Sequence, residues 1–197
     1  MTSLFDRARS FTAHVADHAE EFRALESGQS PEALFITCSD SRVVPSLITG
    51  ARPGELFELR TAGNVVPEYG AGRPCAEAAT IEYAVEVLGV RDIVVCGHSH
   101  CGAVGALVRS EDLSAVPAVR GWLEHATPRP AGGPDHLPDL AASVQDHALN
   151  QLRRLRAHPR VAERVTEGAP SLHAWYYEVH TGSVRAYDAA GDSFRPL

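Results

Sequence analysis

The spacing of apolar residues predicts alternating strands and helices along most of the chain. Short apolar runs at 33–37, 56–59 and 93–96 are typical of strands that are buried on both faces. A segment with helical spacing lies between the second and third runs, from Pro74 to Gly89. Strand, helix and strand in succession imply right-handed parallel crossovers. We therefore expect an α/β fold with a mostly parallel central sheet flanked by helices.

The two ends of the chain carry their own patterns. Residues 4–25 place an apolar side chain at every third or fourth position, which predicts one extended N-terminal helix that Gly28 ends. Helical spacing returns at 144–165, where Pro159 interrupts it. Residues 172–179 alternate in hydrophobicity as a strand does, a Thr-Gly turn follows, and residues 184–187 form a second strand-like run. This last pattern predicts a C-terminal β-hairpin.

Length and composition are those of an ordinary globular domain. The chain has 197 residues, of which 44% are hydrophobic and 22% charged, and this length is enough to bury a substantial core. We expect a single domain over 1–197. Residues 128–138 begin in a run rich in proline and glycine, which predicts a surface loop.

Charge and hydropathy exclude several classes of partner. The net charge is -7 and the chain contains no lysine, so we expect no binding to nucleic acid or to anionic membranes. No apolar run approaches the length of a membrane span. The first residues lack the basic start and apolar centre of a secretory signal. A cytoplasmic location is the resulting expectation.

Three side chains at the ends of two predicted strands suggest a metal site. His98 and Cys101 follow the strand at 93–96, and Cys38 follows the strand at 33–37. Open parallel sheets bind ligands at the carboxyl ends of their strands. Three protein ligands with one open position are typical of catalytic zinc, whereas structural zinc usually has four. We therefore predict one Zn²⁺ per chain.

Neighbouring residues complete this candidate site. Asp40 and Arg42 are spaced to form a bidentate ion pair beside Cys38. Gly102 begins a helix and can offer a backbone N–H near the metal. His100 is expected to be neither a ligand nor a proton shuttle. The remaining cysteines, Cys75 and Cys96, are predicted to be small buried side chains.

The two motifs together resemble the β-class carbonic anhydrases, and specifically a bacterial member of the plant-like subgroup. They are Cys38-Ser39-Asp40-Ser41-Arg42 and His98-Ser99-His100-Cys101-Gly102, with further similar segments such as Arg60-Thr61-Ala62-Gly63-Asn64 between them. The resemblance implies zinc-dependent, reversible hydration of CO₂ to bicarbonate and a proton through a zinc-bound hydroxide. Asp40 would orient that hydroxide.

The same resemblance implies further roles. Gln29, Phe57 and Tyr83 match positions that line the substrate pocket, and the first and last often reach across a dimer interface. The N-terminal helix, residues 1–28, would lie across a partner subunit, so we expect a homodimer or a tetramer. A second bicarbonate site in some members uses Trp, Arg and Tyr. Here Phe35, Arg60 and Tyr177 correspond, and without the Trp we expect an open zinc site.

Two alternatives stay open at this point. Hydrolysis of COS or CS₂ needs the same zinc hydroxide and differs only in access to the pocket. A non-catalytic protein stabilised by zinc would need a fourth ligand, and no further Cys or His lies at close spacing. That alternative would also leave the Asp40 and Arg42 pairing unexplained.

The rate constant for CO₂ hydration should rise with pH through the alkaline side of neutrality. Two thiolates cancel the double charge of Zn²⁺, so the ion is a weaker Lewis acid than one held by three imidazoles, whose water has a pKa of roughly 7. Stopped-flow assays across this range measure the effect. A rate constant that stays flat from mildly acid to alkaline pH would contradict it.

Overall fold

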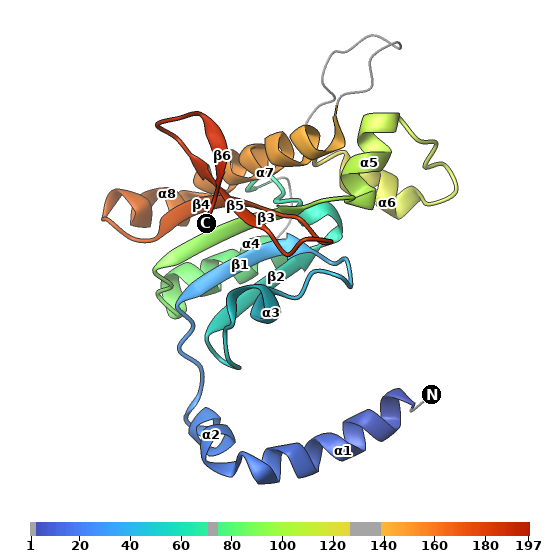
Figure 1. The fold of residues 1–197 in the computed structure, drawn as a ribbon. Coiled ribbons are helices and arrows are strands. Elements are labelled where there is room, and N and C mark those ends of the chain that lie inside the picture. Colours follow the sequence, from blue (N-terminus) through green and yellow to red (C-terminus); the bar gives the residue numbers. More distant parts are fainter. Residues whose placement is uncertain (1–2, 71–74, 127–138) are drawn as a thin grey trace.

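A six-stranded mixed sheet forms the centre of the protein in a computed structural model, which describes residues 3–70, 75–126 and 139–197 (Figure 1). The strands are β1 (Ala33–Cys38), β2 (Leu56–Thr61), β3 (Asp92–His98), β4 (Ser171–Tyr177), β5 (Val184–Asp188) and β6 (Ser193–Pro196). Their spatial order is β2-β1-β3-β4-β5-β6. The first four are mutually parallel, and β5 and β6 are added antiparallel. The predicted α/β class is confirmed, and β6 extends the predicted hairpin by one strand.

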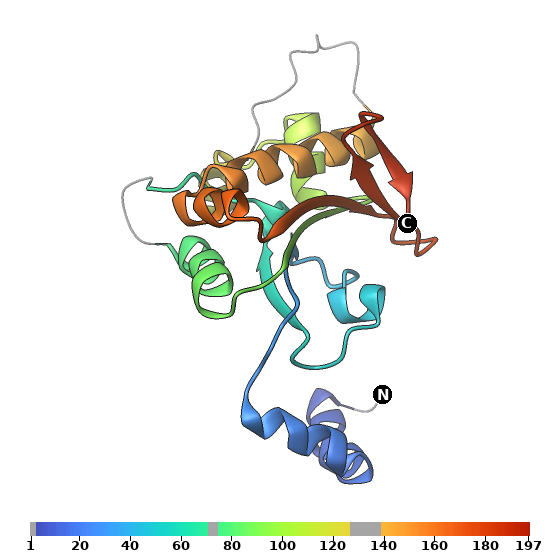
Figure 2. The same cartoon turned by 90° about the vertical axis from the view of Figure 1, so that its left-hand side faces the viewer.

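Alternation along the strands divides the apolar core between the two faces of the sheet. Leu34 and Ile36 of β1 pack with Ile93 and Val95 of β3 in one large cluster. The helices α4 (Ala76–Glu82), α7 (Leu140–Arg156) and α8 (Pro159–Thr166) cover that face (Figure 2). The opposite face carries Phe35, Val94 and Cys96 against Trp175 and Tyr177. The predicted burial of Cys96 is confirmed.

Most predicted helices are present, with local differences. The segment after Cys75 is α-helical through Glu82 and continues as a π-helix over Tyr83–Val87. Pro159 separates α7 from α8, as predicted. The structure also contains the helices α3 (Pro45–Thr49), α5 (Gly102–Arg109) and α6 (Pro117–Leu123), and α6 had no counterpart among the predicted elements. The predicted loop at 128–138 and the predicted helix start at Pro74 lie outside the described residues.

The predicted N-terminal helix is present, but it is not continuous. The helix divides at His18 into α1 (Leu4–Asp17) and α2 (Ala19–Ala24), followed by a 3₁₀ turn at Leu25–Ser27. The His18 ring nitrogen Nδ1 lies 2.9 Å from the carbonyl oxygen of His14, which a continuous helix would give to the His18 backbone N–H. That N–H bonds to Val15 instead. A side chain that competes for the backbone acceptor therefore breaks the helix.

The N-terminal arm, residues 3–27, stands apart from the rest of the protein (Figures 1 and 2). Neither α1 nor α2 contains a buried residue. Leu4, Phe5 and Phe11 are 72%, 75% and 53% exposed. A helix of this kind cannot gain stability from burial within its own chain.

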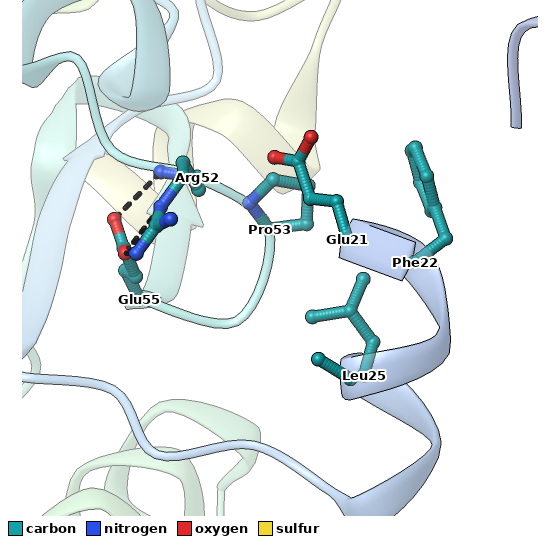
Figure 3. Close-up of a pocket in the computed structure, with 7 residues that line it drawn as sticks. Glu21, Phe22, Leu25, Arg52, Pro53 and Glu55 are labelled. Carbon is teal, nitrogen blue, oxygen red and sulfur yellow. Dashed lines mark hydrogen bonds and ion pairs between the residues drawn. The ribbon is translucent and has the colours of Figure 1, made fainter. Parts of the chain in front are cut away.

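The arm meets the body only at its base in the described residues, around a small apolar pocket (Figure 3). Phe22 and Leu25 of the arm line this pocket together with Pro53 of the loop before β2, and its volume is about 180 Å³. Arg52 and Glu55 stiffen this loop through an ion pair of 2.6 Å. No helix in the described ranges is both long and apolar enough to span a membrane.

Candidate metal centre

Three predicted ligands converge where β1 and β3 end. Cys38 is the last residue of β1, His98 the last of β3, and Cys101 precedes the first residue of α5. Their candidate ligand atoms all lie within 4.8 Å of one another. All three residues are buried, with exposures of 7%, 0% and 1%. Parallel pairing explains the convergence, because Thr37 aligns with Cys96 and so brings the two strand ends together.

The imidazole of His98 is oriented for a metal ion. Its Nδ1 lies 3.0 Å from the carbonyl oxygen of Ser99, a contact that requires the proton on Nδ1. The lone pair of Nε2 is then free. Nε2 is buried and has no hydrogen-bond partner among the described residues. A buried, unpaired nitrogen beside two thiols fits a metal ion that accepts nitrogen and sulfur ligands.

The two thiols perturb each other strongly. A hydrogen bond from Cys101 lowers the pKa of Cys38, and the adjacent Cys38 thiolate raises the pKa of Cys101. Without a cation the pair therefore holds one proton, because two thiolates at this distance repel each other. A divalent cation removes the repulsion and releases that proton. The donor set is one that zinc prefers.

Asp40 and Arg42 form the predicted pair at the edge of this group. The Arg42 guanidinium donates from Nε to Oδ1 at 2.9 Å and from Nη2 to Oδ2 at 2.7 Å. This bidentate contact holds the pKa of Asp40 well below its usual range. Oδ2 also lies 3.9 Å from Nε2 of His98. An ionised carboxylate of fixed orientation therefore stands beside the free imidazole nitrogen.

Arg60 of β2 holds the turn that carries Asp40. Its guanidinium donates hydrogen bonds to the carbonyl oxygens of Cys38, Asp40 and Val43. Three acceptors on one turn fix the path of the chain between the first ligand and the carboxylate. This contact could not be predicted from the sequence, because Arg60 is far along the chain from the turn. The parallel pairing of β1 with β2 brings them together.

The predicted pocket residues do not lie together within one chain. Gly102 lies next to Cys101 at the start of α5. Phe57 and Tyr83 lie together, with ring centroids 5.8 Å apart, but Phe57 is at the opposite end of β2 from Thr61, which pairs with Cys38. Four strand residues span about 13 Å. Gln29 is exposed at the base of the arm, where it lines a second hollow beside Pro53–Glu55.

One contact to the metal group was missed from the sequence. The backbone N–H of Gly63 points at Sγ of Cys38, with N and S 3.4 Å apart. Gly63 has φ +73°, and a Cβ atom there would lie 2.9 Å from Cβ of Ala103. Only glycine accepts both conditions. The signal was present in the Ala62-Gly63-Asn64 segment, which the family resemblance marked without assigning it a role.

Comparison with known proteins identifies the family. Residues 33–184 match the family model described as carbonic anhydrase. A carbonic anhydrase of Pseudomonas aeruginosa is 48% identical over 181 residues, which cover 89% of this chain and 82% of the relative. The solved β-carbonic anhydrase CcaA has a TM-score of 0.89 at 36% identity and covers 98% of this chain and 90% of its own. A tetrameric β-carbonic anhydrase of Sordaria macrospora has a TM-score of 0.70 at 26% identity, covering 92% and 95%. The chain therefore belongs to the β-carbonic anhydrase family.

Replacing one thiol of the group should remove zinc. We expect Cys38→Ser to retain well below one zinc ion per chain after dialysis, because a hydroxyl is a much poorer zinc ligand than a thiolate. Elemental analysis measures the content. Cys75→Ser is the matched control, because Cys75 lies outside the metal group and caps α4 through a 3.4 Å contact to Ala78, and serine caps helices well. Equal zinc contents in the two variants would contradict the assignment.

Proposed function

We propose that the protein is a zinc-dependent carbonic anhydrase that interconverts CO₂ and bicarbonate. The observation that carries this proposal is the buried group of Cys38, His98 and Cys101 with the ionised Asp40 beside it. Family membership supports the reaction, and the donor set supports zinc as the metal. Three protein ligands leave a coordination position for solvent or substrate, as a catalytic site requires.

The side chains around the metal group have distinct tasks. A bound zinc ion supplies the Lewis acidity that makes water a nucleophile near neutral pH. Asp40 can accept a hydrogen bond from the attacking water and so direct its lone pair toward CO₂. Arg42 keeps Asp40 ionised and in one orientation through two hydrogen bonds. Gly102 can donate its backbone N–H to an oxygen of bicarbonate.

The substrate pocket is proposed to need a second chain. CO₂ offers little to recognise, so an apolar wall suits it, and Phe57 with Tyr83 provides one. These rings lie about 13 Å along the sheet from their own metal group. Tyr83 is 45% exposed and can therefore face a neighbouring subunit. We infer that Gln29, Phe57 and Tyr83 complete the pocket of a partner in a homodimer, or in a tetramer built from dimers.

The exposed arm supports the same assembly. Leu4, Phe5 and Phe11 present an apolar surface that remains largely exposed, and a second copy of the body would cover it. The four cysteines are all unpaired, which suits the reducing conditions of the cytoplasm.

Hydrolysis of COS or CS₂ would use the same residues as hydration of CO₂. An assay of the protein with CO₂ and with these sulfur compounds distinguishes the two activities.

Removing the charge of Asp40 should separate catalysis from metal binding. We expect Asp40→Asn to keep its zinc and lose roughly 10²- to 10⁴-fold in the rate of CO₂ hydration, the range typical of a lost proton acceptor. Stopped-flow rates and zinc analysis on the same sample test this. Asp92→Asn is the control, because Asp92 pairs with His173 on the surface at 2.7 Å. Loss of zinc from Asp40→Asn would instead show a structural role.

Deleting the arm should dissociate the subunits. A chain without residues 1–27 is expected to sediment as a monomer and to lose activity, because it lacks the apolar surface that binds the partner. Phe5→Ser should weaken the dimer in the same direction, whereas Arg9→Ser on the same helix should leave it unchanged. A shortened chain that remains dimeric would refute the role of the arm.

A further inference from the structure

The segment that follows β2 is held by side chains from α6, from α7 and from the residue that caps α8. Residues 62–67 run past the metal group, and four of their backbone groups bond to distant side chains. The contacts are Trp122 Nε1 to Ala62 O at 2.9 Å, His147 Nε2 to Gly63 O at 2.8 Å, Val66 N to Gln151 Oε1 at 2.8 Å and His158 Nε2 to Pro67 O at 3.0 Å. None of these side chains belongs to the predicted site. Two of the contacts, to Ala62 O and Gly63 O, are made to the two peptides that flank the Cα of Gly63.

The peptide between Ala62 and Gly63 connects α6 to the metal group. Its carbonyl oxygen accepts from the Trp122 indole, and its N–H donates to Sγ of Cys38. In a planar trans peptide the C=O and N–H bonds point in opposite directions. A donor that fixes the carbonyl therefore aims the N–H at the sulfur.

The next peptide is fixed by His147 of α7. Its carbonyl oxygen, that of Gly63, accepts from Nε2 of His147. His147 is buried, and this burial lowers its pKa, so the ring is neutral near pH 7 and keeps one N–H to donate. Glycine has the greatest backbone freedom of any residue. With a carbonyl anchored on each side of its Cα, Gly63 retains little of that freedom.

We propose that Trp122 and His147 are positioning residues of the metal centre, which hold the Gly63 N–H against the thiolate of Cys38. An N–H···S bond draws electron density from the sulfur and reduces its donation to the metal, which leaves the ion more electrophilic. Partners of this kind, one step removed from the ligands, commonly change metal affinity or activity 10- to 100-fold. The inference rests on the proposed function, because it concerns a ligand of the proposed zinc.

The cobalt-substituted protein reports directly on the sulfur. In Trp122→Phe and His147→Leu we expect the thiolate-to-cobalt charge-transfer band to move to lower energy, because a thiolate without the N–H bond gives up its electrons more easily. Zinc affinity, measured by competition with a chelator, should fall roughly tenfold, because the sulfur is no longer held in position for the metal and this loss outweighs its stronger donation. His147→Gln, whose amide can donate to the same carbonyl, should restore the band. Trp122→Phe keeps an aromatic ring at this position and removes only the N–H donor. It therefore tests the inference even if His147→Leu does not fold.

A matched control separates positioning from general stability. His158 is also buried and also donates to a carbonyl of this segment, but at Pro67, four residues beyond Gly63. His158→Leu should lower the thermal stability of the metal-free protein about as much as His147→Leu, with an unchanged cobalt band and zinc affinity. The inference is overturned if Trp122→Phe and His147→Leu keep the parental band, or if His158→Leu shifts it equally.

Failure of the inference differs from failure of the proposed function. A parental protein that binds neither cobalt nor zinc would refute the proposed function and the inference with it. A parental protein that binds zinc and hydrates CO₂, with variants of unchanged spectrum, refutes the positioning role alone.

Discussion

Two thiols and one imidazole meet at a buried point that a cation must stabilise. Like charges about 4 Å apart repel by roughly 4 kcal/mol at an effective dielectric of 20, so Cys38 and Cys101 cannot both ionise there unaided. A divalent cation between the two sulfurs attracts both thiolates and so offsets this repulsion. The charge requirement of this pair, together with the unpaired Nε2 of His98 among the described residues, makes the strand ends suited to hold a metal ion.

The rest of the sheet edge serves this electrostatic requirement. Arg60 neutralises no acid in the group but gathers three carbonyls of the turn after β1, and this turn presents Asp40. Arg42 then keeps Asp40 charged in a place where a second anion beside thiolates would otherwise be unfavourable. The site therefore contains separate arginines for backbone shape and for carboxylate charge.

Features of the fold and of the site that depend on local sequence patterns could be predicted. Apolar runs located β1 and β3, and residues that directly follow strand ends must share an edge, which is why Cys38, His98 and Cys101 could be grouped. The break at His18 was missed because it depends on one ring competing with the backbone for the His14 carbonyl. The anchors at Trp122 and His147 were missed because they lie 60 and 84 residues from their acceptors, and no spacing rule reaches that far.

The separation of Phe57 and Tyr83 from the metal ligands of their own chain has a genetic consequence. If each pocket draws its wall from one subunit and its metal from the other, two differently damaged chains can repair each other. A mixed dimer of one chain altered at Asp40 and another altered at Tyr83 would contain one pocket with both defects and one with neither. Alleles of this gene would then show complementation between two inactive products, a behaviour that a self-contained monomeric enzyme cannot have.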